Sequence, residues 1–197
     1  MLELAIALIV FLFPLAYSPG PGNMFFAANG ARFGLKATFP ANAGYHLATW
    51  SVTAAIGLGF AAILEAQPGF FTVIKWAGSA YVLYLAYRLY RAGAAGGGED
   101  ARPAGFMDGV ILLLLNPKAY VIIALMFSQF LAGRETDHLV AVLLIATVFT
   151  LNNFVAFIVW TLAGDRIALR FRDPGQARRL NAIFAFTLAA VAIWMLL

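Results

Sequence analysis

The sequence predicts an all-α polytopic membrane protein with six transmembrane helices, arranged as two inverted three-helix repeats. Three observations support this fold class. The chain of 197 residues is 63% hydrophobic and 11% charged, which is more apolar surface than one soluble core of this size can bury. Uncharged apolar runs long enough to cross about 30 Å of hydrocarbon recur along the chain. Two of these runs are interrupted by proline at matching places in the two halves.

Six apolar segments define the predicted helices. They cover about residues 4–29, 39–64, 70–89, 106–131, 139–162 and 180–197. The first segment has neither the basic start nor the small-residue cleavage site of a signal peptide, so we expect it to be a transmembrane helix.

The basic residues predict the orientation of the chain. Ten lie in the first, third and fifth loops: Arg32, Lys36, Arg88, Arg91, Arg102, Arg166, Arg170, Arg172, Arg178 and Arg179. Only Lys75 and Arg134 lie on the opposite side, and Lys118 lies inside a predicted helix. The positive-inside rule then places the odd-numbered loops in the cytoplasm and both termini outside. Because these clusters adjoin helix ends, they favour contact with membrane lipid over nucleic-acid binding.

A glycine-rich linker divides the chain near its midpoint. We expect one transmembrane domain with repeat 1 at about residues 1–91, the linker at about 92–103 and repeat 2 at about 104–197. Each repeat has three apolar segments, and an odd number forces the two repeats to insert with opposite orientation. Many secondary transporters have this plan.

Two proline motifs interrupt the first helix of each repeat. The first is SPGP at residues 18–21 and the second is NPK at residues 116–118, with Pro19 and Pro117 lying 98 positions apart. Interrupted helices at corresponding places in two repeats are the best sequence indication of a transport site. The alternative is a pair of packing kinks, because proline is common in membrane helices.

The chemistry of these breaks suits a zwitterion. The prolines are expected to free the carbonyl groups of Leu15, Tyr17 and Leu113. Ser18 and Asn116 each precede a proline, as N-cap residues do. Restarted helices offer N–H groups and partial positive charge to a carboxylate, and the freed carbonyls offer acceptors to an ammonium group. An amino acid carries both groups.

Other polar residues inside the predicted helices complete the candidate site. Lys118 could bind a carboxylate, change its protonation or extend to the interface. Asn152 and Asn153 could bind substrate or join helices by hydrogen bonds, and His46 could carry a coupling proton or be structural. The predicted substrate-binding residues are Tyr17, Ser18, Pro19, Gly20, Pro21, Asn23, Asn116, Pro117, Lys118, Asn152 and Asn153, and the proton-coupling candidates are His46 and Lys118.

Several classes of protein are disfavoured. The chain has no cysteine and two histidines, and its few acidic residues form no cluster within the helices, so we expect no metal site. The hydrolase, zinc-protease and nucleotide-binding motifs are absent from the sequence. We therefore expect neither an enzyme nor a cofactor.

Four stretches in order along the chain resemble the LysE/RhtB family of amino-acid exporters: SPGPGNMFFAANGARFGLKATFP, KWAGSAYVLYLAYRLYRA, RPAGFMDGVILLLLNPKAYVI and RRLNAIFAFTLAAVAIWML. The pattern is most similar to the branch that includes cysteine and O-acetylserine exporters. The resemblance implies secondary-active export of small amino acids or their derivatives from the cytoplasm, driven by proton antiport. It also implies that residues 18–21 and 116–118 belong to the site. One departure is Gly22, where related proteins often have Asn or Asp.

Two alternatives of other classes stay open at this point. One is a passive channel or an ion or metal exporter with the same architecture, and the other is a membrane-embedded enzyme or partner subunit. The sequence does not decide which amino acid is bound, nor whether the protein forms a homodimer.

Overall fold

The computed structural model describes residues 2–60, 69–94, 102–131, 138–169, 174–194 and 196. Over these residues the chain forms seven α-helices and one short π-helical segment, and no strand. The elements are α1 (Leu2–Tyr17), α2 (Pro21–Ala55), the π-helical segment η1 (Ile56–Phe60), α4 (Phe70–Ala94), α5 (Phe106–Leu114), α6 (Pro117–Phe130), α7 (His138–Ala168) and α8 (Pro174–Trp194).

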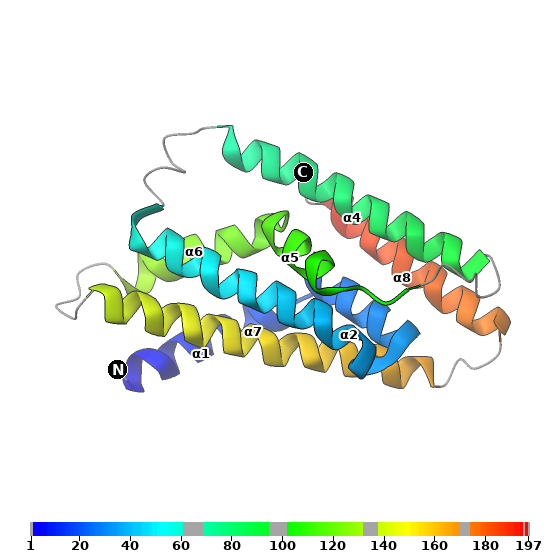
Figure 1. Ribbon diagram of the computed structural model, residues 1–197, viewed down its shortest axis with the longest axis horizontal. Helices are drawn as coiled ribbons and strands as arrows, with labels where there is room; N and C mark the ends of the chain where they lie inside the picture. The colour runs from blue at the N-terminus through cyan, green and yellow to red at the C-terminus, as the bar shows by residue number, and fades with distance from the viewer. Residues whose placement is uncertain are drawn as a thin grey trace.

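Helix α2 consists of two arms that meet at Gly34. The backbone leaves the helical conformation there, with φ 75° and ψ 173°, a region that glycine adopts without steric cost. The chain reverses at this point, so that residues 21–33 and residues 35–55 run back past one another (Figure 1). We call these segments the first and second arms of α2.

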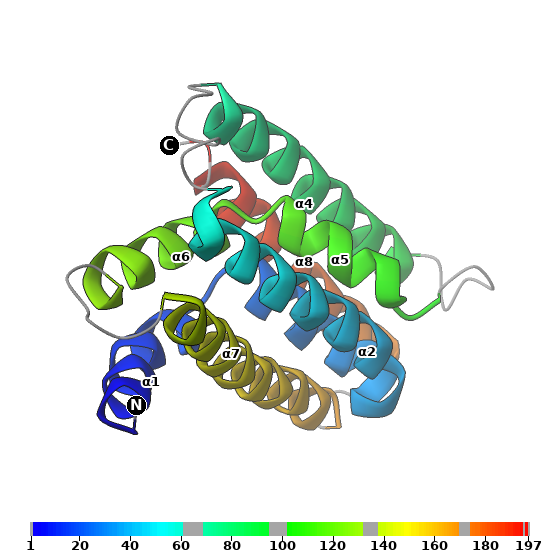
Figure 2. The same ribbon diagram turned by 60° about the vertical axis from the view of Figure 1, so that its left-hand side comes forward.

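The bundle is organised around α2. It packs against α7, α5 and α8, while α4 and α8 pack against each other and lie side by side at one edge of the molecule (Figures 1 and 2). Glycines allow the closest crossings. A Cβ atom on Gly30 would overlap the carbonyl of Thr161, and a Cβ atom on Gly164 would overlap that of Ala27. Such small-residue contacts are typical of helices that associate in membranes.

The outer surface of α7 is apolar and its inner face carries polar residues. Leu151, Val155 and Val159 are 59%, 49% and 46% exposed, whereas Asn153 and Thr161 are buried. A surface helix of a soluble protein has the opposite arrangement. Polar residues that face the bundle interior are typical of a membrane protein.

Within the described residues, α7 is long and apolar enough to cross a membrane without interruption. Two bent pairs, α1 with α2 and α5 with α6, raise the number of candidate spans to three. The predicted arrangement of six spans in two repeats therefore stays a prediction. Linker residues 95–101 and the basic residues Arg134, Arg170 and Arg172 lie outside the described part of the chain.

Some predicted boundaries were wrong because hydrophobicity alone set them. The first and fourth segments are each two helices separated by a break, as their proline motifs predicted, but other helix ends differ. Helix α8 begins at Pro174 rather than at residue 180, and α7 continues to Ala168 rather than ending at 162. The added turns are polar, but Arg and Gln are good helix formers, so the helices extend beyond their apolar parts.

Candidate functional site between two broken helices

The two proline motifs break helices in the structure, as predicted. The chain between α1 and α2 is non-helical at residues 18–20, and the helices on either side are bent by 64°. The chain between α5 and α6 breaks at residues 115–116, with a bend of 63°. Nearly equal bends thus occur at corresponding places in the two halves.

The two helix restarts differ in their N-caps. Asn116 is the N-cap of α6 and Pro117 its first residue, as predicted, although the Asn116 side chain makes no capping hydrogen bond. The prediction that Ser18 caps the other helix was wrong, because α2 begins at Pro21 with Gly20 as its N-cap. The motif contains two prolines, and the second is the one that occupies the first helical position.

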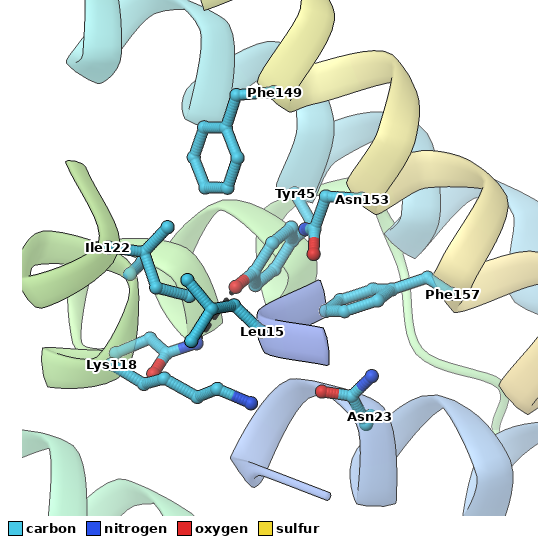
Figure 3. A pocket seen from close by; sticks show the side chains of 10 residues that line it. Leu15, Asn23, Tyr45, Lys118, Ile122, Phe149, Asn153 and Phe157 are labelled. Atoms are coloured by element: carbon cyan, nitrogen blue, oxygen red, sulfur yellow. Dashed lines mark hydrogen bonds between the residues drawn. The ribbon is translucent and has the colours of Figure 1, made fainter. Parts of the chain in front are cut away.

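Lys118 joins the two breaks. Its Nζ donates to the Oγ of Ser18 at 2.9 Å and to the Ser18 carbonyl at 3.1 Å, and it lies 3.5 Å from the carbonyl of Pro19. The side chain thus extends from the start of α6 to the first break (Figure 3). Lys118 therefore binds acceptors of this break other than the carbonyls of Leu15 and Tyr17, which the sequence suggested for a substrate ammonium group.

The carbonyls that proline frees are satisfied by the protein. The Leu15 carbonyl accepts from the Ser18 hydroxyl at 3.0 Å, and the Tyr17 carbonyl accepts from Nε1 of Trp160 at 3.3 Å. The Leu113 carbonyl accepts from the Asn116 amide N–H at 2.9 Å. An unpaired carbonyl in hydrocarbon costs several kcal/mol, so these bonds stabilise the broken conformation.

A small cavity of about 20 Å³ lies between the breaks, which is room for about one water molecule. Its polar lining residues are Asn23, Tyr45, Asn116, Lys118 and Asn153, and its other lining residues are Leu15, Ala119, Ile122, Phe149 and Phe157 (Figure 3). The lining includes one positively charged side chain and no acidic one.

The second break presents an unpaired acceptor beside this cavity. Nδ2 of Asn116 donates to the hydroxyl oxygen of Tyr45 at 2.8 Å. The other side-chain atom, Oδ1 of Asn116, is buried without a hydrogen-bond partner. Leaving such an atom unpaired costs about 1–3 kcal/mol, so Oδ1 would gain from a ligand that donates a hydrogen bond.

His46 and Asn153 form a buried pair at the other side of the cavity. Nδ1 of His46 lies 2.8 Å from the Asn42 carbonyl, which can only accept, so Nδ1 carries a hydrogen. Nε2 of His46 lies 3.2 Å from Nδ2 of Asn153, which can only donate, so Nε2 is the acceptor. This orientation of the Asn153 amide corresponds to a neutral His46 ring and directs the Asn153 oxygen toward the cavity (Figure 3).

The structure brings some predicted residues together and leaves others at the edge. Asn23, Asn116, Lys118 and Asn153 line the cavity. The predicted residues that do not line it are Tyr17, Ser18, Pro19, Gly20, Pro21, Pro117 and Asn152. Of these, Ser18 holds Lys118, and Gly20 lies close enough that an added Cβ atom would be 3.0 Å from Nζ of Lys118.

Tyr45 and the apolar lining residues were missed by the sequence analysis. Tyr45 directly precedes His46 in a helix, and side chains of adjacent helix residues project about 100° apart. The choice of His46 as a candidate therefore did not indicate that Tyr45 lines the cavity. Among the described residues, no group of three His, Cys, Asp or Glu side chains could hold a metal ion.

A polar cavity between two interrupted helices, enclosed by a bundle with an apolar exterior, is typical of secondary transporters of the membrane. A family model described as "LysE type translocator" matches residues 13–197. The chain belongs to this family, which confirms the family predicted from its sequence motifs.

Relatives with known names are similar over most of their length. A "Cysteine/O-acetylserine efflux protein" of Klebsiella pneumoniae is 29% identical, over 95% of this chain and 94% of the relative. A "Homoserine/homoserine lactone efflux protein" of Salmonella typhimurium is 25% identical, over 86% and 84%. A "Leucine efflux protein" of Enterobacter is 25% identical, over 75% and 72%. No solved structure matches the chain.

Proposed function

We propose that this protein exports small neutral amino acids or their derivatives from the cytoplasm in exchange for protons. The observation that carries the proposal is the contact of Lys118 with the first helix break, which fixes one ammonium group beside a polar cavity. The relatives support it, because their names include homoserine, cysteine, O-acetylserine and leucine, which are neutral amino acids, and homoserine lactone, a derivative without a free carboxylate.

The two ends of a zwitterion have separate partners in this proposal. The carboxylate pairs with Nζ of Lys118, and the ammonium group donates to Oδ1 of Asn116 and Oδ1 of Asn153. A cationic amino acid is disfavoured, because a second positive charge about 4 Å from Lys118 costs about 4 kcal/mol at an effective dielectric constant near 20. No acidic lining residue offsets this cost.

His46 and Asn153 supply the coupling. When Nε2 of His46 takes up a proton it becomes a donor, so Asn153 must turn its oxygen from the cavity to the imidazolium. The Asn153 amide nitrogen then faces the cavity and no longer accepts from the substrate ammonium group. Proton and substrate thus compete, which is the requirement for antiport, and Lys118 is the second candidate carrier of the proton.

The architecture that belongs to this function has six spans in an inner membrane, with both termini outside. Gly34 supports it, because the turn there separates the first arm of α2, which follows α1, from the second arm. Residues 2–33 would then form one interrupted span and residues 35–60 the next. The matching bends near Pro19 and Pro117 support two inverted repeats.

Release from proteoliposomes tests the function. Vesicles containing the protein are loaded with labelled serine, homoserine, leucine, lysine or aspartate, and release is followed with and without an acidic exterior. We expect the neutral amino acids to leave faster when the exterior is acidic, and a protonophore to remove the effect. Absence of release for every amino acid would contradict export. Release at the same rate with and without the pH gradient would favour the alternative that the protein is a passive channel.

A further inference from the structure

One face of the second arm of α2 carries five buried polar side chains. They are Thr38, Asn42, His46, Thr49 and Thr53, and none is more than 4% exposed. Spacings of four, four, three and four residues keep them on one side of the helix. Polar groups inside a membrane protein are costly and are usually retained for a function.

Several of these groups have no partner. Both side-chain atoms of Asn42 and the hydroxyl of Thr53 are buried without a hydrogen bond, as is the hydroxyl of Thr150 on α7. Asn42 lies one turn from His46 on one side, and Thr53 lies two turns away on the other. Buried polar groups of this kind usually bind ordered water.

Helix α7 runs antiparallel to this face. Nε1 of Trp50 donates to Oγ1 of Thr147 at 3.1 Å, and His46 lies beside Asn153. Thr150 stands between these two contacts along α7, so it lies on the same side of His46 as Thr53. The unpaired groups therefore continue along the helix on both sides of the histidine.

The polar face ends near the surface on one side and at the α2 turn on the other. At one end, Nε2 of His138, an exposed side chain, donates to the carbonyl of Gly57 at 2.9 Å. Gly57 belongs to the π-helical segment, and such segments are frequent at functional sites. At the other end, Thr38 donates to the carbonyl of Gly34 at 2.8 Å.

We propose that this face is a hydrated proton path in two parts, one from the His138 end of the bundle to His46 and one from His46 to the Gly34 end, which carry the proton in separate steps so that it does not cross without substrate exchange. The inference rests on the proposed antiport and names its proton route. Successive side chains on a helix face are about 5–6 Å apart, which is too far for a direct hydrogen bond, so one water completes each step. At each step a water or a threonine hydroxyl accepts one proton and releases its own, while the Asn42 amide orients a water without carrying the proton. Nε2 of His46 takes up the proton midway and later releases that same proton.

Aromatic rings surround His46, so a proton would reach it along the polar face of the helix. The rings of Tyr45, Phe154 and Phe157 lie 5.2, 5.3 and 5.1 Å from its ring centre. Among the side chains that line the cavity beside its partner Asn153, Tyr45 and Lys118 are titratable and none is acidic. A proton on His46 therefore has no carboxylate to retain it and can be released.

Thr53→Val and Asn42→Leu test the path, because both nearly preserve side-chain shape. In proteoliposomes we expect proton uptake during substrate efflux to fall about tenfold in each variant, as for a barrier raised by one interrupted step. Substrate counterflow, which needs no net proton movement, should persist. Thr53→Ser should restore proton uptake. The control is Ser51→Ala, on the exposed side of the same helix, which should behave as the wild type.

Accessibility to a hydrophilic thiol reagent gives a second test. The chain has no cysteine, so Asn42→Cys, Thr53→Cys and the control Ala54→Cys each carry a single thiol. Ala54 is also buried but lies off the polar face. We expect methanethiosulfonate ethylammonium to modify positions 42 and 53 at least tenfold faster than position 54. Equal rates at all three positions, or no reaction at 42 and 53, would overturn the path.

The two tests separate failure of the path from failure of the function. If the wild type shows neither counterflow nor proton uptake for any amino acid, the proposed function fails, and the thiol reaction still decides whether the face is hydrated. If the wild type couples efflux to protons and Thr53→Val and Asn42→Leu couple equally well, the function stands and the path is wrong.

Discussion

Lys118 changes the assignment of partners at the site. The sequence suggests that a substrate ammonium group binds the carbonyls that proline frees at the first break, but these accept from Ser18 and Trp160, and the Lys118 ammonium group is bound to Ser18 beside them. In the proposed function, the substrate carboxylate is therefore the end that pairs with Lys118. The substrate ammonium group is then proposed to bind the amide oxygens of Asn116 and Asn153.

His46→Gln separates coupling from transport. Glutamine offers a side chain of similar length that forms hydrogen bonds but does not titrate near neutral pH. We expect counterflow of a neutral amino acid to stay within about threefold of the wild type, while the acceleration by an acidic exterior is lost. Release rates over a series of outside pH values measure this. A pH response equal to that of the wild type would transfer the proton role to Lys118.

Gly22→Ala tests the close approach of Phe157 to the start of α2. A Cβ atom on Gly22 would lie 2.5 Å from Cζ of Phe157, so this buried ring, which lines the cavity, must move. We expect the half-saturating substrate concentration to rise about tenfold, a cost of about 1.4 kcal/mol that is within the range for overpacking.

The matched control for this change is Gly69→Ala, since an added Cβ atom there has no neighbour within 4 Å. It should transport as the wild type. An unchanged half-saturating concentration in Gly22→Ala would show that Gly22 is needed for the chain turn before α2 and not for the shape of the cavity.

Polarity explains which site residues the sequence could predict. Asn23, Asn116, Lys118 and Asn153 are exceptional in apolar segments, and each lines the cavity. Asn152 is equally exceptional but is absent from the lining, because adjacent residues of a helix point in different directions. Phe149 and Phe157 resemble every other apolar residue in their segment, so only the fold distinguishes them.

At the scale of elements, proline predicts where helices break but not how the chain turns within the break. Both interruptions were predictable from proline positions, because proline lacks the amide donor that continues a helix. The start of α2 at Pro21 rather than Pro19 was not, since both prolines fit a first helical position. The reversal itself was predicted as the loop between the first two segments. Its form, a turn at Gly34 between two helical arms, was not, because a single glycine in a polar loop has many conformations.

Gly109→Ala tests the packing of α5 against α2. An added Cβ atom would overlap the carbonyl of Ala41, and overpacking costs about 1–3 kcal/mol. We expect Tm in detergent to fall by about 2–10 °C, as measured by thermal unfolding. In the control Gly105→Ala the added atom would lie 3.7 Å from Oδ2 of Asp108, so Tm should hold. Equal Tm values for both variants would contradict the close crossing.

At the scale of the whole molecule, the cavity is much smaller than an amino acid. Binding of an amino acid there would require the elements around the cavity to separate. The apolar content of the chain made a helical membrane protein predictable. The pairing of α4 with α8 was not, because either helix could present a similar apolar face to several partners.

The cysteine-free chain allows a direct test of orientation. Lys36→Cys lies near the predicted cytoplasmic turn, and Leu2→Cys lies near the predicted outer end of α1. In intact cells we expect a membrane-impermeant maleimide to label position 2, and to label position 36 only after permeabilisation. The reverse pattern would place the termini in the cytoplasm.

The central claim is that the two broken helices bind the substrate through Lys118. Counterflow of a labelled neutral amino acid by Lys118→Met tests it most directly, because methionine keeps an unbranched apolar side chain and removes the ammonium group. The control Lys36→Met removes the same charge from an exposed position. We predict that Lys118→Met exchanges at least about tenfold more slowly than the wild type, with equal amounts of folded protein in the vesicles, while Lys36→Met exchanges normally. Equal exchange by the two variants would contradict the account.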